Sequence, residues 1–165
     1  MSSDCKYLVR KTDKQRAQLV NVQHPLNERS QVTLRGIGRA AGLVRTGVTY
    51  AVLPPSRESF IYHSHKREEE WVFIISGSGT AIIDGDEFPV SAGDFMGFPT
   101  PSVAHTLINS SEDDLIYLMG GESKHFEIGE FPNLGKLLIR DGREAFMVDK
   151  GSFVEFPPKS EELDP

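Results

Sequence analysis

The chain has 165 residues, 38% of them hydrophobic and 25% charged, which fits one domain with a core of its own. The 24 Asp and Glu residues outnumber the 18 Lys and Arg residues, giving a net charge of −6. This acidic balance argues against a nucleic-acid-binding surface. No apolar run exceeds the five residues of 71–75, far short of the roughly 20 residues that a membrane helix needs. We therefore expect no nucleic-acid partner and no membrane partner.

Two features of the sequence bear on the cellular compartment. The amino terminus is charged and lacks the apolar segment of a secretory signal. Cys5 is the single cysteine, so no internal disulfide can form. We expect a cytoplasmic protein.

Short β-rich segments separated by Gly, Pro, Asn and Asp occupy most of the chain. Strands are expected over 47–53, 59–65, 71–75, 80–84, 87–90, 93–98, 105–109 and 114–119. Strands at a spacing of about 8 to 12 residues are typical of an all-β sandwich or barrel. A hairpin is expected over 136–149, turning at Asp141 and Gly142. No segment has the length and period of a substantial helix.

The expected strand at 70–75 is apolar on both faces, because successive side chains alternate between them. One face carries Glu70, Val72 and Ile74, and the other carries Trp71, Phe73 and Ile75. The first face fits a barrel interior. The second is too apolar to remain in water, so we expect a terminal arm or a second subunit to cover it, and we favour a homodimer.

A group of potential metal ligands lies in and around these strands. His63 and His65 are two residues apart and therefore point to the same side of a strand, Glu70 opens the next strand, and His105 begins a later one. A lone histidine is more often a hydrogen-bonded residue than a ligand. Three imidazoles and a carboxylate together suit a divalent transition metal.

The spacing of these residues resembles the two motifs of the cupin superfamily. In the first motif, G(x)5HxH(x)3,4E(x)6G, the matching residues are His63, His65, Glu70 and Gly77. In the second, G(x)5PxG(x)2H(x)3N, they are Gly93, Pro99, His105 and Asn109. Two departures lie in loops: Arg57 replaces the first glycine, and the chain between Pro99 and His105 is one residue longer than the pattern.

The resemblance implies an all-β fold, a single cupin jelly-roll barrel of antiparallel strands with short N- and C-terminal extensions. We divide the chain into an N-terminal arm (1–30), the barrel with its metal site (31–125), and a C-terminal hairpin with a mobile acidic tail that packs on the barrel (126–165).

The resemblance also implies one divalent transition metal inside the barrel, with Fe preferred and Mn, Ni, Zn or Cu as alternatives. The ligands would be His63, His65, Glu70 and His105, and the six-residue gap to Gly77 selects Glu70 rather than Glu69. Side chains expected to line the chamber around the metal are Ile61, Val72, Ile74, Leu107 and Asn109.

Three classes of function remain open for such a site, each with a small organic molecule as substrate or ligand. We favour an Fe(II) oxidoreductase of the dioxygenase type, since no acid or base stands out beside the metal. The alternatives are a Lewis-acid isomerase, decarboxylase or lyase, and a non-catalytic binding protein. The second class needs a proton carrier, for which the candidates are Tyr50, Tyr62, Tyr117 and His125.

Overall fold

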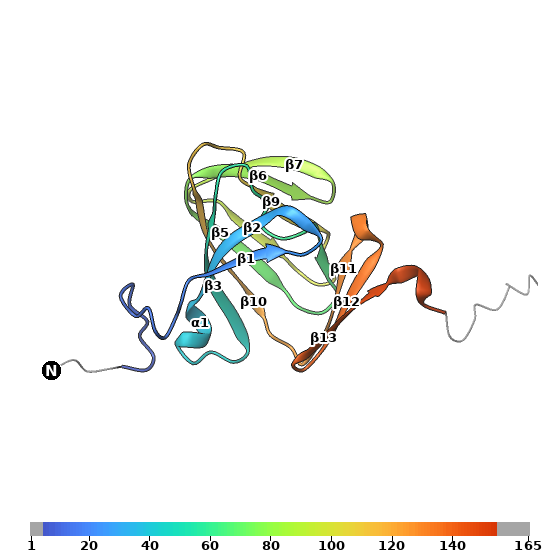
Figure 1. Cartoon of the computed structure of the whole chain (residues 1–165), viewed down its shortest axis with the longest axis horizontal. Coiled ribbons are helices and arrows are strands. Elements are labelled where there is room, and N and C mark those ends of the chain that lie inside the picture. Colours follow the sequence, from blue (N-terminus) through green and yellow to red (C-terminus); the bar gives the residue numbers. More distant parts are fainter. Residues whose placement is uncertain (1–4, 155–165) are drawn as a thin grey trace, which may run out of the picture.

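The structure, a computed structural model, describes residues 5–154, and β-strands dominate it (Figure 1). The strands are β1 (Val20–His24), β2 (Asn27–Gly36), β3 (Thr46–Leu53), β4 (Ser64–His65), β5 (Glu70–Ser76), β6 (Ser78–Ile83), β7 (Asp86–Ser91), β8 (Phe95–Phe98), β9 (His105–Ile108), β10 (Leu115–Glu122), β11 (Phe126–Phe131), β12 (Lys136–Asp141) and β13 (Glu144–Asp149). Three single turns of helix complete the list: α1 (Ile37–Ala40), η1 (Pro132–Leu134) and η2 (Lys150–Ser152). The expected acidic tail lies outside the described residues.

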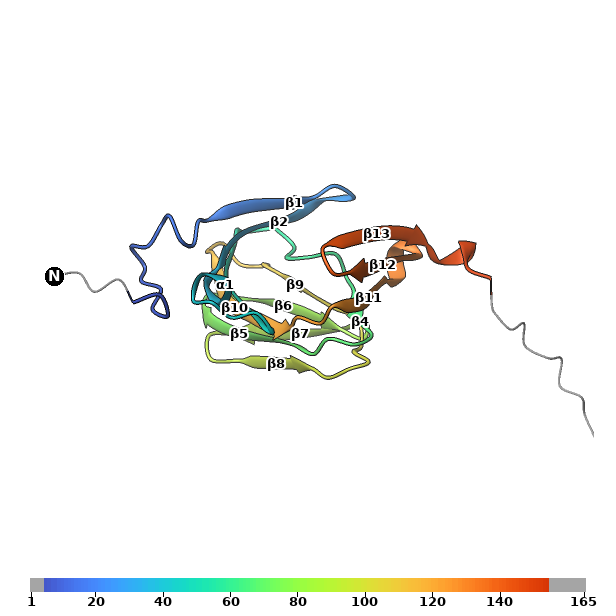
Figure 2. The ribbon, with the colours of Figure 1, turned by 90° about the horizontal axis from the view of Figure 1, so that it is seen from below.

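The strands form three antiparallel sheets. Their orders are β1-β2-β3-β10-β5-β8, β7-β6-β9 and β13-β12-β11-β4. Figure 2 shows the β11–β13 sheet at the end of the barrel opposite to the N-terminal segment. The expectation of an all-β jelly-roll barrel is confirmed. Among the described residues, no helix is long and apolar enough to cross a membrane.

The core lies between the sheets, and alternation along each strand decides which side chains enter it. Ala51 and Leu53 on β3, Ile74 on β5, and Leu115 and Tyr117 on β10 are at most 1% exposed. The outward face of β5 is less well covered. Phe73 and Ile75 remain 38% and 41% exposed, and Phe95 on the neighbouring β8 is 64% exposed.

The structure differs from the expected strand at 59–65, since only Ser64 and His65 form a strand. The backbone before them meets β9 through single bridges at Glu58 and His63. Between these bridges, the Phe60 carbonyl accepts a hydrogen bond from the Thr106 hydroxyl at 2.6 Å, and the Ile61 carbonyl faces the His63 ring. Both carbonyls therefore contact side chains instead of a neighbouring strand.

The two ends of the chain join the sheets. β1 and β2 form a hairpin, and β2 pairs with β3, which extends the largest sheet; residue 30, where we ended the arm, lies inside β2. At the other end, β12 and β13 form the expected hairpin around Asp141 and Gly142. β11 pairs with β4, the strand that carries His65.

Candidate metal centre

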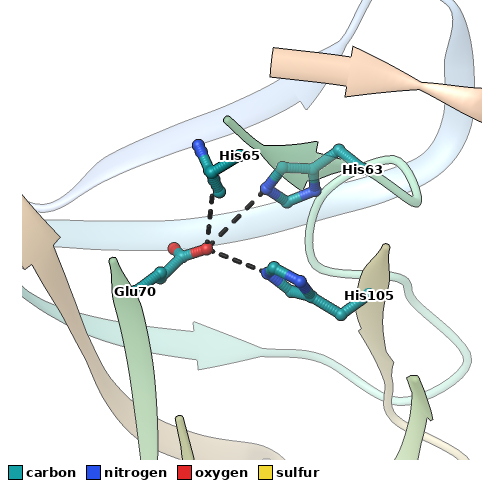
Figure 3. A group of neighbouring side chains, drawn as sticks. All are labelled: His63, His65, Glu70 and His105. Carbon is teal, nitrogen blue, oxygen red and sulfur yellow. Dashed lines mark hydrogen bonds and ion pairs between the residues drawn. The ribbon is translucent and has the colours of Figure 1, made fainter. Parts of the chain in front are cut away.

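Three imidazoles and one carboxylate converge from three segments of the chain: His63 and His65 from the segment that ends in β4, Glu70 from the start of β5, and His105 from the start of β9. One ligand atom from each of His63, His65, Glu70 and His105 lies within 4.8 Å of the others. Figure 3 shows the three rings grouped around one oxygen of Glu70. Glu70 Oε2 is 2.9 Å from His105 Nε2, 3.3 Å from His65 Nε2 and 3.8 Å from His63 Nε2.

Two of the rings are held by backbone carbonyls. His63 Nδ1 lies 2.7 Å from the Ile61 carbonyl oxygen, and His105 Nδ1 lies 3.1 Å from the Val103 carbonyl oxygen. A carbonyl can only accept, so each Nδ1 carries a proton, and the neutral ring with its one proton at Nδ1 would offer the Nε2 lone pair to a metal. This is the tautomer that a metal bound at Nε2 requires.

Electrostatics favour the protonation states of a ligand set at His63 and Glu70, but not at His65. Burial lowers the pKa of His63 to about 4, so this imidazole is neutral at pH 7. Burial alone would raise the pKa of Glu70, but hydrogen bonds from His105 and His65 hold it well below its usual range. Burial also works against the charge on His65, yet its hydrogen bond to Glu70 and the charges of Glu70 and Glu127 raise its pKa. Neutral imidazoles and an ionised carboxylate are the forms that bind metals.

The donor set fits a divalent transition metal. Three imidazole nitrogens and one carboxylate oxygen suit Fe, Mn, Ni, Zn or Cu. The structure brings Glu70 to the histidines, whereas Glu69, its neighbour, is exposed. The Glu69 backbone N–H instead reaches the Glu122 carboxylate at 3.2 Å.

A cavity of about 30 Å3 lies inside the barrel against the candidate ligands. Its lining includes His63, Glu70 and His105, two of the expected residues (Val72 and Leu107), and Ser59, Phe60, Met96, Phe98, Thr106, Tyr117 and Met119. The other three expected residues lie elsewhere. Ile74 is in the core, Ile61 faces a separate groove, and the Asn109 amide donates to the carbonyls of Leu53 and Asp113.

Of the four candidate proton carriers, the structure places Tyr117 beside the ligands. Its side chain lines the cavity, and its buried hydroxyl has the Ser59 side chain as a polar neighbour but makes no well-formed hydrogen bond among the described residues. Tyr50 lies on the opposite face of β3 from the inward-facing Ala51, and Tyr62 lines the separate groove. His125 is at the surface, paired with Asp141.

A second cavity, of about 160 Å3, opens outside the inner one and also reaches His65 and Glu70. Its rim is acidic, with the carboxylates of Glu68, Glu69 and Glu122. The two cavities share Glu70 and Met119 as lining residues. From the sequence, Glu69 and Glu70 were considered only as alternative metal ligands, and an acidic cavity entrance was not predicted.

Comparison with known proteins identifies the family. A family model for the cupin domain matches residues 49–121. A protein of known structure from Acidithiobacillus ferrooxidans, provisionally named a sugar phosphate isomerase, is 31% identical over 91% of this chain and 96% of that one, with a TM-score of 0.84. The chain belongs to the cupin superfamily.

Other proteins of known structure share the fold. A sugar phosphate isomerase from Silicibacter pomeroyi is 22% identical over 90% of this chain and 98% of its own, with a TM-score of 0.79. The polyketide cyclase RemF from Streptomyces resistomycificus is 14% identical over 71% and 81%, with a TM-score of 0.57. No curated protein matches the chain. Because one fold supports several reactions, the fold does not choose among them.

Proposed function

We propose that this cupin is a metal-dependent isomerase that moves a proton within a small hydroxy-aldehyde or hydroxy-ketone. The likeness to the Acidithiobacillus protein along nearly the whole chain supports the reaction class. The observation that carries the proposal is the shared cavity of Tyr117 and the three ligands His63, Glu70 and His105. A divalent metal on these ligands and His65 would supply Lewis-acid polarisation of a carbonyl oxygen.

In this proposal Tyr117 donates a hydrogen bond to the substrate oxygen, and the Glu69 carboxylate of the outer cavity would take up the proton from one carbon and return it to the next. Burial raises the pKa of its phenol, so the hydroxyl keeps its proton at neutral pH. A buried hydroxyl without a partner costs about 1 to 3 kcal/mol, and a substrate oxygen that accepts its hydrogen bond recovers that cost. Tyr117 would therefore bind and orient a substrate oxygen beside the ligands.

The size of the two cavities sets how a substrate would lie. The inner cavity has room for only one or two non-hydrogen atoms, and the side chains of Val72, Phe98 and Leu107 make much of its wall apolar. The reacting end of the substrate would enter here. The remainder would occupy the outer cavity, which adjoins at Glu70 and Met119.

The charge of the outer cavity favours an uncharged substrate. Glu68, Glu69 and Glu122 line it, and each adds a negative charge near the entrance. Lys124 pairs with Glu122 and Arg140 pairs with Glu68, which leaves Glu69 to repel an anion. We therefore expect a neutral sugar-like molecule to be a better substrate than its phosphate ester.

A second candidate is the Fe(II) oxidoreductase expected from the sequence. The apolar walls and small volume of the inner cavity favour it, since dioxygen is a small apolar molecule. This activity would require Fe(II) and oxygen, whereas isomerisation needs neither.

The test combines metal reconstitution with deuterium exchange. Apoprotein loaded with Mn(II), Zn(II) or Fe(II) is mixed with short neutral aldoses, ketoses and their phosphates in D2O, with and without oxygen. We expect deuterium to enter at the carbon next to the carbonyl under anaerobic conditions. Tyr117→Phe should lower the turnover rate by about 100-fold or more with metal content unchanged. Tyr50→Phe, on the outer face of the neighbouring strand, is the matched control.

Two results would contradict the proposed isomerase activity. Turnover that stops without oxygen and requires Fe(II) would establish the second candidate. Tight ligand binding without exchange or turnover under any condition would indicate a binding protein.

A further inference from the structure

Among the three histidines, His65 has a different neighbour at its second ring nitrogen. The Nδ1 atoms of His63 and His105 face backbone carbonyls, but His65 Nδ1 faces the carboxylate of Glu127, with Oε1 at 3.5 Å. His65 Nδ1 is buried and makes no hydrogen bond within the described chain. Glu127 is itself 5% exposed, so its charge is also shielded from water.

The same carboxylate holds the segment that joins two candidate ligands. Glu127 Oε1 accepts the backbone N–H of Lys66 at 2.9 Å, and Oε2 accepts that of Arg67 at 3.1 Å. These residues directly follow His65 and lead to Glu70. Glu127 therefore contacts both the ring of His65 and the loop that joins His65 to Glu70.

A second buried glutamate ties this loop to the C-terminal sheet from the other side. Glu68 is 7% exposed, and its carboxylate accepts hydrogen bonds from the Arg140 side chain and the Lys124 backbone N–H. Arg140 lies on β12, and Glu127 lies on β11. Residues 66–69 are thus held between two charged contacts from β11 and β12, strands that lie beyond residue 121, where the cupin family model ends.

We propose that Glu127 is a positioning residue for the metal ligand His65, an inference that rests on the proposed metal site. An imidazole that binds a metal through Nε2 carries its proton on Nδ1, and a buried N–H needs an acceptor. Glu127, 3.5 Å away, is the acceptor within reach, and a hydrogen bond to it in the metal-bound protein would fix the ring and make Nε2 a better donor. Loss of such an outer partner weakens metal binding by about 10- to 100-fold in other proteins.

The test compares two glutamates of the same strand. In Glu127→Gln the amide oxygen still accepts from the loop N–H groups, but the negative charge facing His65 is lost. Glu130→Gln is the matched control, because Glu130 also lies on β11 and pairs with Lys66 and Lys150 without contacting a candidate ligand. Zn(II) affinity is measured on each apoprotein by competition with a chelating dye, and the visible spectrum is recorded with Co(II).

We expect Glu127→Gln to bind Zn(II) about 10-fold more weakly or worse and to show a shifted Co(II) spectrum, with Glu130→Gln unchanged. Wild-type affinity and an unshifted spectrum in Glu127→Gln would overturn the role of Glu127. If the wild-type protein itself binds neither metal, the proposed function fails instead, which keeps the two failures distinct.

If Glu127→Gln does not fold, a measurement on the wild-type protein tests the role of Glu127 instead. In the Zn(II)-loaded protein, we expect the His65 Nδ1–H proton to give an NMR signal that exchanges slowly with water, with a downfield shift from the carboxylate acceptor. A His65 ring without a protected Nδ1–H would contradict the proposal.

Discussion

The ring of Phe98 lies flat against the imidazole of His105, with their centroids 3.6 Å apart and their planes within 6°. Phe98 is 5% exposed, so this stack is sealed from water. His105 is thereby fixed on three sides: Phe98 against its face, the Val103 carbonyl at Nδ1 and Glu70 at Nε2.

Phe98→Leu should weaken metal binding without unfolding the protein. The substitution keeps an apolar side chain but removes the flat surface, and aromatic stacking of this kind is worth about 0.5 to 1.5 kcal/mol, or about a 2- to 10-fold change in affinity. Phe95→Leu is the control, because Phe95 lies on the same strand and stacks on Trp71 outside the barrel. Equal affinities of the two variants, measured by competition titration, would show that the stack does not orient His105.

Two adjacent glutamates should behave differently when each loses its charge. Glu70→Gln should strip the metal, since it replaces the one carboxylate within the cluster, and Glu69→Gln should leave the content near one ion per chain. Elemental analysis of protein purified without a chelating column provides the measurement. The reverse result would mean that Glu69 is the ligand and that the register of β5 is wrong.

The outer face of β5 and β8 leads us to propose a homodimer. Phe73, Ile75 and Phe95 leave a partly exposed apolar surface there. Phe73→Glu should convert the protein to a monomer in sedimentation velocity, while Phe88→Glu, on β7 in a different sheet, should not. A monomeric wild-type protein at tens of micromolar would contradict the dimer.

The metal-free protein should lose stability as the pH falls from 6.5 toward 4. In the unfolded chain His63 takes up a proton over this range, but burial keeps its folded pKa at about 4, so acid favours unfolding. The loss from this group is at most about 3 kcal/mol, and protonation of Glu70 adds to it at lower pH. His65, whose pKa is raised, opposes the trend, since the stability that it contributes is present at low pH and is lost as pH rises through its folded pKa.

Urea unfolding at several pH values measures how steeply the free energy of unfolding falls with falling pH. His63→Gln should make this dependence shallower. NMR titration of the His63 ring gives an independent check. A midpoint near 6.5 in the folded apoprotein would contradict the burial argument.

The resemblance to the two cupin motifs predicted the barrel and the grouping of His63, His65, Glu70 and His105, whereas local spacing alone indicated an all-β fold and placed His63 and His65 on one side of the chain. Alternation along β5 correctly placed Val72 and Ile74 inside.

The contacts that span the sheets could not be predicted in this way. No local pattern near Glu127 indicates that it faces His65, since the contact depends on how β11 pairs with β4. Similarly, Tyr50 and Tyr117 lie on neighbouring strands, and only the register between β3 and β10 shows that they face opposite sides. The expected strand at 59–65 was wrong over most of its length because side chains take the carbonyls of Phe60 and Ile61.

The pairing of β4 with β11 also fixes when the site can be completed during synthesis. A ribosome releases the chain from its amino terminus, so all candidate ligands up to His105 emerge before β11 begins at Phe126. Until then, the two-residue strand at Ser64 and His65 lacks its backbone partners at Glu130 and Gly129. Tight metal uptake at the proposed site would therefore be a late event, which follows release of the C-terminal sheet and comes after the first steps of folding.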